Sequence, residues 1–287
     1  ILRIQGGGFA AADSVLLGIV REGPAEMRDE ALWYLTISLR TQGRLREAMA
    51  RAREYGTHQP PTNQGASLQA AQILFESGRF QEAAALFDSL AVFPAPGTVR
   101  GLLARHKSWM LAHLATTHAA AGDTIALQAV LEPLAGWGAR SHYGRDRRLY
   151  HHANGLLLAA RGQVEEAAAE LRRAIFSPTL GYTRTNYELA RTLLALGRAG
   201  EAVTVLEAAL RGPLDASNLY ITRTELHALL GRAHEAAGEP DSAAAHYRAV
   251  LAAWRNADPL FLARRDSIRM RLAALGRAAR SGPTSSR

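Results

Sequence analysis

Three histidines near the middle of the chain are the side chains best suited to metal chemistry. His142, His151 and His152 lie close together in sequence, and imidazole nitrogens bind transition metals well. However, adjacent residues of a helix point about 100° apart, so His151 and His152 are poorly placed to bind one metal ion together. We therefore interpret these histidines as structural, and the sequence predicts neither a metal nor any other cofactor.

Catalytic motifs are also missing from the sequence. His234 and Glu235 begin like a His-Glu-x-x-His zinc motif, but Gly238 occupies the position of the second histidine. No Gly-x-Ser-x-Gly elbow and no phosphate loop ending in Gly-Lys occurs. Glu165 and Glu166 are adjacent in sequence, and such a pair is typical of the solvated face of a helix. The sequence therefore predicts a protein that is not an enzyme.

Positive charge is concentrated near the carboxyl end. Residues 255–287 hold eight Arg and two Asp, which accounts for six of the eight net positive charges. A basic helix can bind nucleic acid, anionic lipid or an acidic partner. Because no aromatic residues interleave with the arginines on the basic face of this helix, we interpret the helix as a solvated cap and expect no nucleic-acid partner. The basic loop Gly138–Arg148, which carries Tyr143, is interpreted as an exposed connection.

Composition limits the remaining classes. The 287 residues contain no cysteine, which excludes disulfides and thiolate chemistry but leaves the cellular compartment unknown. No run of about 18 apolar residues occurs, so we expect no membrane span and a chain that is soluble as given. Lys107 is the only lysine beside many arginines, a bias that indicates a GC-rich bacterial source.

A short pattern recurs along the chain. In each copy a helical stretch ends at a glycine, and a second helical stretch has an alanine five residues later, as in Gly78 and Ala83. Apolar residues recur three and four positions apart, which predicts helices with one buried stripe. One copy is degenerate because Leu127 replaces the alanine. The turn glycines of the six copies are Gly43, Gly78, Gly122, Gly162, Gly197 and Gly238.

These residues resemble the tetratricopeptide repeat (TPR) family, whose unit is a pair of helices about 34 residues long. Further positions match, namely Leu35, Leu114, Leu189, Leu230, Gly155, Gly231, Pro24 and Pro60. The resemblance covers almost the whole chain. It implies an all-α fold, a right-handed α-solenoid of stacked helix-turn-helix repeats with a C-terminal capping helix. It also implies that the chain binds other proteins.

In this family, first-helix positions two, five, six, nine and twelve line a concave groove that holds peptides. The resemblance therefore implies a protein or peptide ligand, and it places in the groove Trp33, Tyr34, Trp109, His113, His152, Arg184, Tyr187, Arg191 and Arg232. Ala119, Ala159 and Ala160 would line its middle. Packing of these side chains between neighbouring units is the open alternative. The Lys and Asn of the family's clamp for chaperone tails are missing, so such tails are not expected as ligands.

The two ends of the chain differ. Phe9–Val20 reads as a second helix without its first helix, so we expect the given chain to begin inside a repeat. Asp258 and Pro259 suit the cap and first position of a last helix. The segment Tyr247–Leu275 resembles the end of repeat regions attached to some large bacterial serine/threonine kinases and related signalling proteins. We expect residues 1–28 to form a partial repeat, 29–258 six repeats, 259–280 a capping helix and 281–287 a disordered tail.

Two functional hypotheses follow. The first is a non-catalytic scaffold for protein–protein contacts, as the TPR region of a longer bacterial signalling or envelope protein. The second is a structural subunit that self-associates through its open N-terminal helix. Head-to-tail contacts that do not close would then produce filaments.

Overall fold

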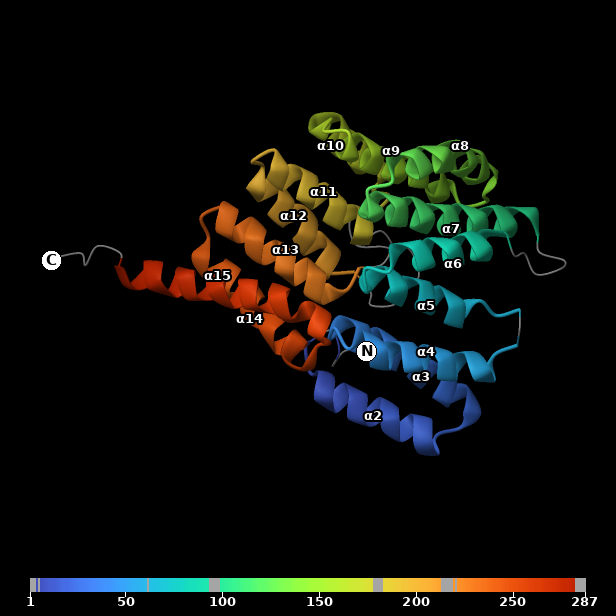
Figure 1. Cartoon of the computed structure of the whole chain (residues 1–287), viewed down its shortest axis with the longest axis horizontal. Coiled ribbons are helices and arrows are strands. Elements are labelled where there is room, and N and C mark those ends of the chain that lie inside the picture. Colours follow the sequence, from blue (N-terminus) through green and yellow to red (C-terminus); the bar gives the residue numbers. More distant parts are fainter. Residues whose placement is uncertain are drawn as a thin grey trace.

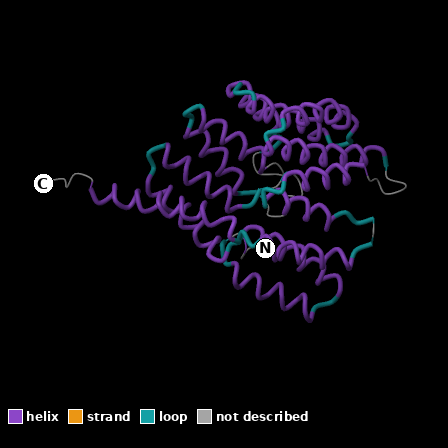
Figure 2. The backbone as a smooth tube through the Cα atoms, in the orientation of Figure 1, coloured by secondary structure: helices purple, strands orange, loops and turns teal. Residues whose placement is uncertain are grey.

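The computed structural model describes residues 4, 6–60, 62–92, 99–177, 183–212, 219 and 221–281, with side chains to residue 277. Within these residues every regular element is helical, as Figure 2 shows. The long helices are α2 (Phe9–Glu22), α3 (Ala25–Thr41), α4 (Leu45–His58), α5 (Gly65–Glu76), α6 (Phe80–Val92), α7 (Arg100–Ala121), α8 (Thr124–Arg140), α9 (Leu149–Ala160), α10 (Val164–Ala174), α11 (Thr183–Ala195), α12 (Ala199–Leu210), α13 (Arg223–Ala236), α14 (Pro240–Ala253) and α15 (Leu262–Ser281). Short 3-10 helices cover Gly144–Arg148 (η1), Trp254–Asn256 (η2) and Pro259–Phe261 (η3).

Six helix pairs, from α3–α4 to α13–α14, form the repeat units. All six predicted turn glycines have φ between +69° and +78°, a region that glycine enters without steric cost. Close helix approach is confirmed at Gly231, where an added Cβ would lie 2.3 Å from the Tyr247 ring. The predicted all-helical repeat architecture is therefore confirmed, while its right-handed sense and the domain boundaries stay predictions.

The units stack into a curved array whose two ends meet (Figure 1). The turn between α3 and α4 contacts the corner between α14 and α15. The amide of Asp258 donates to the Gly43 carbonyl over 2.9 Å, and the Thr224 hydroxyl donates to the Thr41 carbonyl over 2.7 Å. One hydrophobic cluster joins Leu45, the first residue of α4, to Trp254 and Phe261. We call these contacts the clasp.

Asp258 and Pro259 occupy the predicted cap and first positions, at the start of η3, which leads directly into α15. The Asp258 carboxylate accepts the backbone N–H of Arg46 over 2.9 Å, so it caps α4 across the clasp and makes no cap bond to its own helix. Thr185 lies inside α11, where its hydroxyl contacts His152. Thr222 caps α13 by accepting a hydrogen bond from the Glu225 amide.

Buried polar contacts join α2 to α3 and α3 to α5. Asp13 of α2 accepts hydrogen bonds from Ser38 and Gln42 over 2.6 and 2.8 Å. Arg40 of α3 forms a two-point ion pair with Glu76 of α5. Because both contacts are largely shielded from water, they fix the register of the first units. Of the predicted tail 281–287, Ser281 is instead the last residue of α15, and residues 282–287 lie outside the described residues.

Candidate interaction groove

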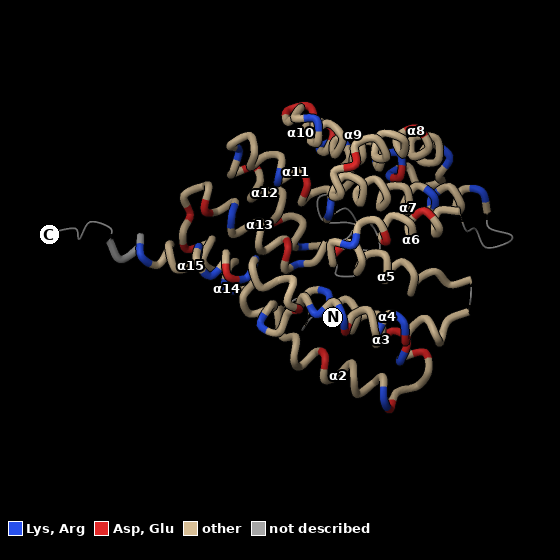
Figure 3. The backbone as a smooth tube through the Cα atoms, viewed as in Figure 1, with Lys and Arg blue, Asp and Glu red and all other residues tan. Residues whose placement is uncertain are grey.

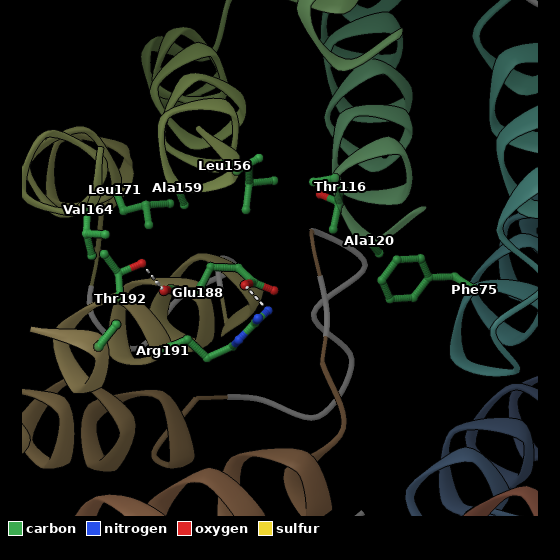
Figure 4. Close-up of a pocket in the computed structure, with 13 residues that line it drawn as sticks. Phe75, Thr116, Ala120, Leu156, Ala159, Val164, Leu171, Glu188, Arg191 and Thr192 are labelled. Atoms are coloured by element: carbon green, nitrogen blue, oxygen red, sulfur yellow. Dashed lines mark hydrogen bonds and ion pairs between the residues drawn. The ribbon is translucent and has the colours of Figure 1, made fainter. Parts of the chain in front are cut away.

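Three adjoining hollows follow the first helices of the later units, and together we call them the inner groove. The first, of about 490 Å³, lies between α7, α9, α10 and α11 and is shown in Figure 4. The second, of about 300 Å³, lies between α5, α11 and the clasp. The third, of about 370 Å³, lies between α11, α13 and α15. Arg191 lines the first two hollows and Tyr187 the second and third, so the hollows form one continuous surface.

Small and apolar side chains line most of the first hollow. Ala119, Ala159 and Ala160 all lie on its wall, as the sequence predicted for the middle of the groove. Leu156 stands opposite an ion pair between Arg191 and Glu188, as Figure 4 shows. The alanines leave room for a large side chain, and the volume falls within the range of about 300–1,000 Å³ that is typical of ligand pockets.

Charged residues of α11 separate the first hollow from the second. Glu188 contacts two guanidinium groups, with 2.9 Å to Arg191 and 3.8 Å to Arg184. Arg184 also lies over the Phe75 ring at 4.9 Å. The attraction of Glu188 raises the pKa of Arg191, and the Arg191 side chain remains 60% exposed. Arg184 is therefore held in place, while Arg191 is available to a ligand.

The third hollow lies between Tyr187, Arg232 and the start of α15. Arg264 of α15 makes a two-point ion pair with Glu225, and Arg271 pairs with Glu235 over 2.9 Å. Both arginines remain largely exposed, with 47% of the Arg264 side chain and 43% of the Arg271 side chain open to solvent, and Figure 3 marks basic residues along α15 in blue. A capping role for α15 is consistent with these contacts and stays a prediction. Burial raises the pKa of Tyr187 to about 12, so this phenol stays neutral.

Three predicted groove residues are buried in the seams between units, which corrects the sequence prediction. Trp109 is 4% exposed within the largest hydrophobic cluster, and His113 stacks on Phe87 at 4.8 Å. His152 is completely buried and contacts the hydroxyls of Thr116 and Thr185 over 3.0 Å each. Burial lowers the pKa of both histidines to about 3. These side chains pack between units and line none of the three hollows, although His113 borders a small hollow of about 20 Å³ beside Phe75 and Arg184.

The predicted pair on α3 lies away from the groove. Trp33 is half-buried and meets the Tyr55 ring edge-on at 5.7 Å, and Tyr34 packs with Trp33 against Ile37. Neither side chain lines any of the three hollows. Of the nine predicted residues, the groove therefore brings together Arg184, Tyr187, Arg191 and Arg232.

Sequence reasoning missed several groove residues. Phe75 and Arg40 each stand three residues before a turn glycine, the position at which Ala119 and Ala159 were correctly placed. Glu188 occupies the sixth first-helix position of its unit. The repeat positions of these three residues could therefore have indicated that they line the groove. Arg264 belongs to α15, outside the six units, so no repeat position indicates its place.

The histidines first considered for metal binding are separated in the structure. The His151 imidazole pairs with Glu170 over 2.8 Å, whereas His152 lies between two threonines. Among the described residues no group of three or more His, Cys, Asp or Glu side chains has the arrangement of a metal site. None of the described helices combines the length and hydrophobicity needed to cross a membrane.

Comparison with known proteins identifies the class. Two family models, both described as tetratricopeptide repeat, match residues 35–97 and 152–218 and residues 224–249, just over half of the chain in total. The chain therefore belongs to the tetratricopeptide repeat family. Proteins built from these repeats are scaffolds for protein interactions, and the fold is typically non-catalytic. A comparison with curated proteins found no match.

Solved structures agree with the fold. A tetratricopeptide repeat protein from Parabacteroides merdae has 14% identity and a TM-score of 0.50, covering 96% of this chain and 94% of that one. A chain of the APC/C hetero-tetramer Cut9-Hcn1 has 14% identity and a TM-score of 0.47, covering 95% of this chain and 47% of that one. The TPR2AB domain of yeast Sti1, solved in a complex with pHSP90, has 12% identity and a TM-score of 0.37, covering 87% and 98%. The first supports the fold alone, and the other two carry no further argument.

Proposed function

We propose that the chain is a non-catalytic scaffold whose inner groove binds an extended segment of a partner protein. The observation that carries this proposal is the continuity of the three hollows along α7, α9, α11 and α13. Aromatic and arginine side chains, which anchor many protein interfaces, stand between them as Tyr187 and Arg191. The groove thus combines room for side chains with groups that can orient a ligand.

We also propose a cellular setting for this scaffold. We place the scaffold in a longer bacterial signalling or envelope protein. The arginine-rich composition and the similarity of residues 247–275 to repeat regions of bacterial kinases support this setting. The sequence of the full-length gene product would test it, since a signalling or envelope-anchoring domain in the same polypeptide is expected.

A selection from a random peptide library tests the groove directly. Peptides selected on the full chain should bind at least about tenfold more weakly to Ala159→Trp, because the indole would fill the first hollow. Ala85→Trp is the matched control, since Ala85 is exposed on α6 and lines none of the three hollows. Selected peptides that bind Ala159→Trp and the native chain equally would exclude the groove as the binding site.

Self-association is a second candidate, favoured by the apolar surface of α2. Val15 is 54% exposed and Leu17 38% exposed, and Met27 at the start of α3 is also exposed. A second copy that covered these exposed side chains could extend the array. Sedimentation across a concentration series should then show association that Val15→Glu abolishes. A native chain that remains monomeric at all concentrations would exclude this candidate.

A further inference from the structure

Two exposed arginines occupy the same place in successive units of the groove. Arg191 and Arg232 each stand six residues before a turn glycine, Gly197 and Gly238 respectively. Both side chains line hollows of the inner groove. In the first four units the equivalent residues are buried and uncharged, namely Ile37, Gln72, Thr116 and Leu156. The positive pair is therefore confined to the last two units.

These two positions also carry the groove's surplus of positive charge. Glu188 is shared between Arg184 and Arg191, so the α11 cluster has one more arginine than carboxylates. Arg264 and Arg271 are each matched by a glutamate. Among the described residues Arg232 has neither an ion pair nor a hydrogen bond. A ligand with negative charge would thus find one unmatched positive charge on α11 and another on α13.

The repeat geometry sets the spacing between these charges. Packed helices lie roughly 8–10 Å apart, and α11 and α13 contact each other directly. An extended peptide advances about 3.3 Å per residue, so roughly three residues span one helix spacing. Carboxylates three positions apart in an extended chain can therefore reach Arg191 and Arg232 together.

We propose that the inner groove binds an acidic peptide segment in which two carboxylates lie three residues apart beside a bulky apolar residue. The carboxylates pair with Arg191 and Arg232. The apolar side chain enters the first hollow, where Leu156 and the alanines form an apolar wall next to Arg191. This inference rests on the proposed function, because it specifies the ligand of the same groove.

The surroundings of the arginines favour a peptide over a nucleic acid. Proteins that bind single strands stack bases on open aromatic faces. Within the groove the guanidinium of Arg184 lies over the Phe75 ring at 4.9 Å and 5.8 Å from the centre of the Tyr187 ring. Trp254 is 1% exposed. These rings therefore offer little free surface on which a base could stack.

Fluorescence anisotropy with designed peptides tests the inference on the full chain. The probe is a fluorescein-labelled peptide with one Leu followed by two Glu three positions apart in a Gly-Ser background. Replacing both Glu by Gln should weaken binding about tenfold or more, since charge-assisted contacts are lost. Moving the two Glu to adjacent positions should weaken binding severalfold, because one carboxylate then misses its arginine. Replacing the Leu by Ser should also weaken binding severalfold, because the first hollow is then left empty.

Protein variants complete the test. Arg191→Gln and Arg232→Gln should each weaken binding of the Glu peptide by about five- to tenfold. Arg248→Gln is the control for net charge, because Arg248 is exposed on α14 and lines none of the three hollows. It should change the affinity less than about twofold. Circular dichroism melts establish that all three variants fold.

Several outcomes would overturn the inference. The Glu peptide could fail to bind, the Gln peptide could bind equally well, or the groove variants could behave like Arg248→Gln. Equal binding of an oligothymidylate that competes with the peptide would point to general polyanion binding instead. If the random library meanwhile gives non-acidic peptides that depend on Ala159, only the acidic specificity fails and the proposed function stands.

Discussion

Two pairs of side chains on first helices lie in different environments, one buried between units and the other beside the open groove. Trp109 and His152 lie in the seams between units, whereas Arg191 and Arg232 border open hollows. All four stand on first helices. The difference follows from the position along the helix, because α7 packs against α9 just as α11 packs against α13. Trp109 and His152 stand 13 and 10 residues before their turn glycines, whereas Arg191 and Arg232 stand six residues before theirs. A side chain that could anchor a ligand is therefore equally suited to holding two repeats together.

The largest expected effect is the loss of a seam aromatic. Trp109→Ala should lower the free energy of unfolding by about 3–5 kcal/mol, as other truncations of buried aromatic residues do. Urea denaturation followed by circular dichroism measures this change. Tyr187→Ala is the comparison variant and should cost less, since Tyr187 is half-buried at the edge of the groove. Equal losses in the two variants would contradict the distinction between seam and groove.

A pH titration of stability sharpens the same comparison. The pKa of His152 is about 3 in the folded chain and about 6.5 when unfolded. The unfolded state then binds more protons, so stability falls as the pH drops below about 6.5. At about pH 5 this one histidine should cost roughly 2 kcal/mol relative to about pH 7.5.

The variant His152→Gln isolates this contribution, because glutamine keeps polar groups for Thr116 and Thr185 but does not titrate. Its loss of stability between about pH 7.5 and pH 5 should be smaller than that of the native chain by roughly 2 kcal/mol. His58→Gln is a suitable control, since His58 pairs with Asp29 at an exposed site. An unchanged pH dependence in His152→Gln would show that the imidazole is accessible to water.

The clasp should contribute a smaller effect. Asp258→Ala removes the cap of α4 and leaves the Arg46 amide without its partner. Loss of a helix cap typically costs about 1 kcal/mol, and urea denaturation can resolve that change. Asp266→Ala is the control, since Asp266 forms an exposed ion pair with Arg269 of the same helix. If Asp258→Ala is as stable as the control, the carboxylate contact of the clasp contributes nothing to stability.

Much of the fold could be predicted from the sequence because the repeat register is local information. A glycine such as Gly78 marks a turn through its own backbone freedom, and Ala83 marks close packing five residues later. Asp258 could not be placed in this way. Its partner Arg46 lies 212 residues away in sequence, so the contact depends on the curvature of the whole array.

The candidate site was less predictable than the fold. Repeat positions indicate which residues lie on the inner side of a first helix, but the distance to the next unit decides whether they are exposed. His113 and Glu188 share the sixth position of their units, yet His113 stacks on Phe87 while Glu188 joins the arginine cluster. The packing of each pair of units therefore had to be known before the groove could be identified.

The smallest expected effect on stability, and the most informative for function, is at Arg191. Arg191→Ala should change the free energy of unfolding by less than about 0.5 kcal/mol, since exposed ion pairs contribute little. The same variant should weaken binding of a groove peptide by roughly 1–2 kcal/mol, because Arg191 lines two of the three hollows. Urea denaturation and fluorescence anisotropy on one protein sample give both values, with Arg248→Ala as the control. A variant that loses stability but keeps its affinity would move Arg191 from the groove to the seams, and the binding surface would then have to be sought on other helices.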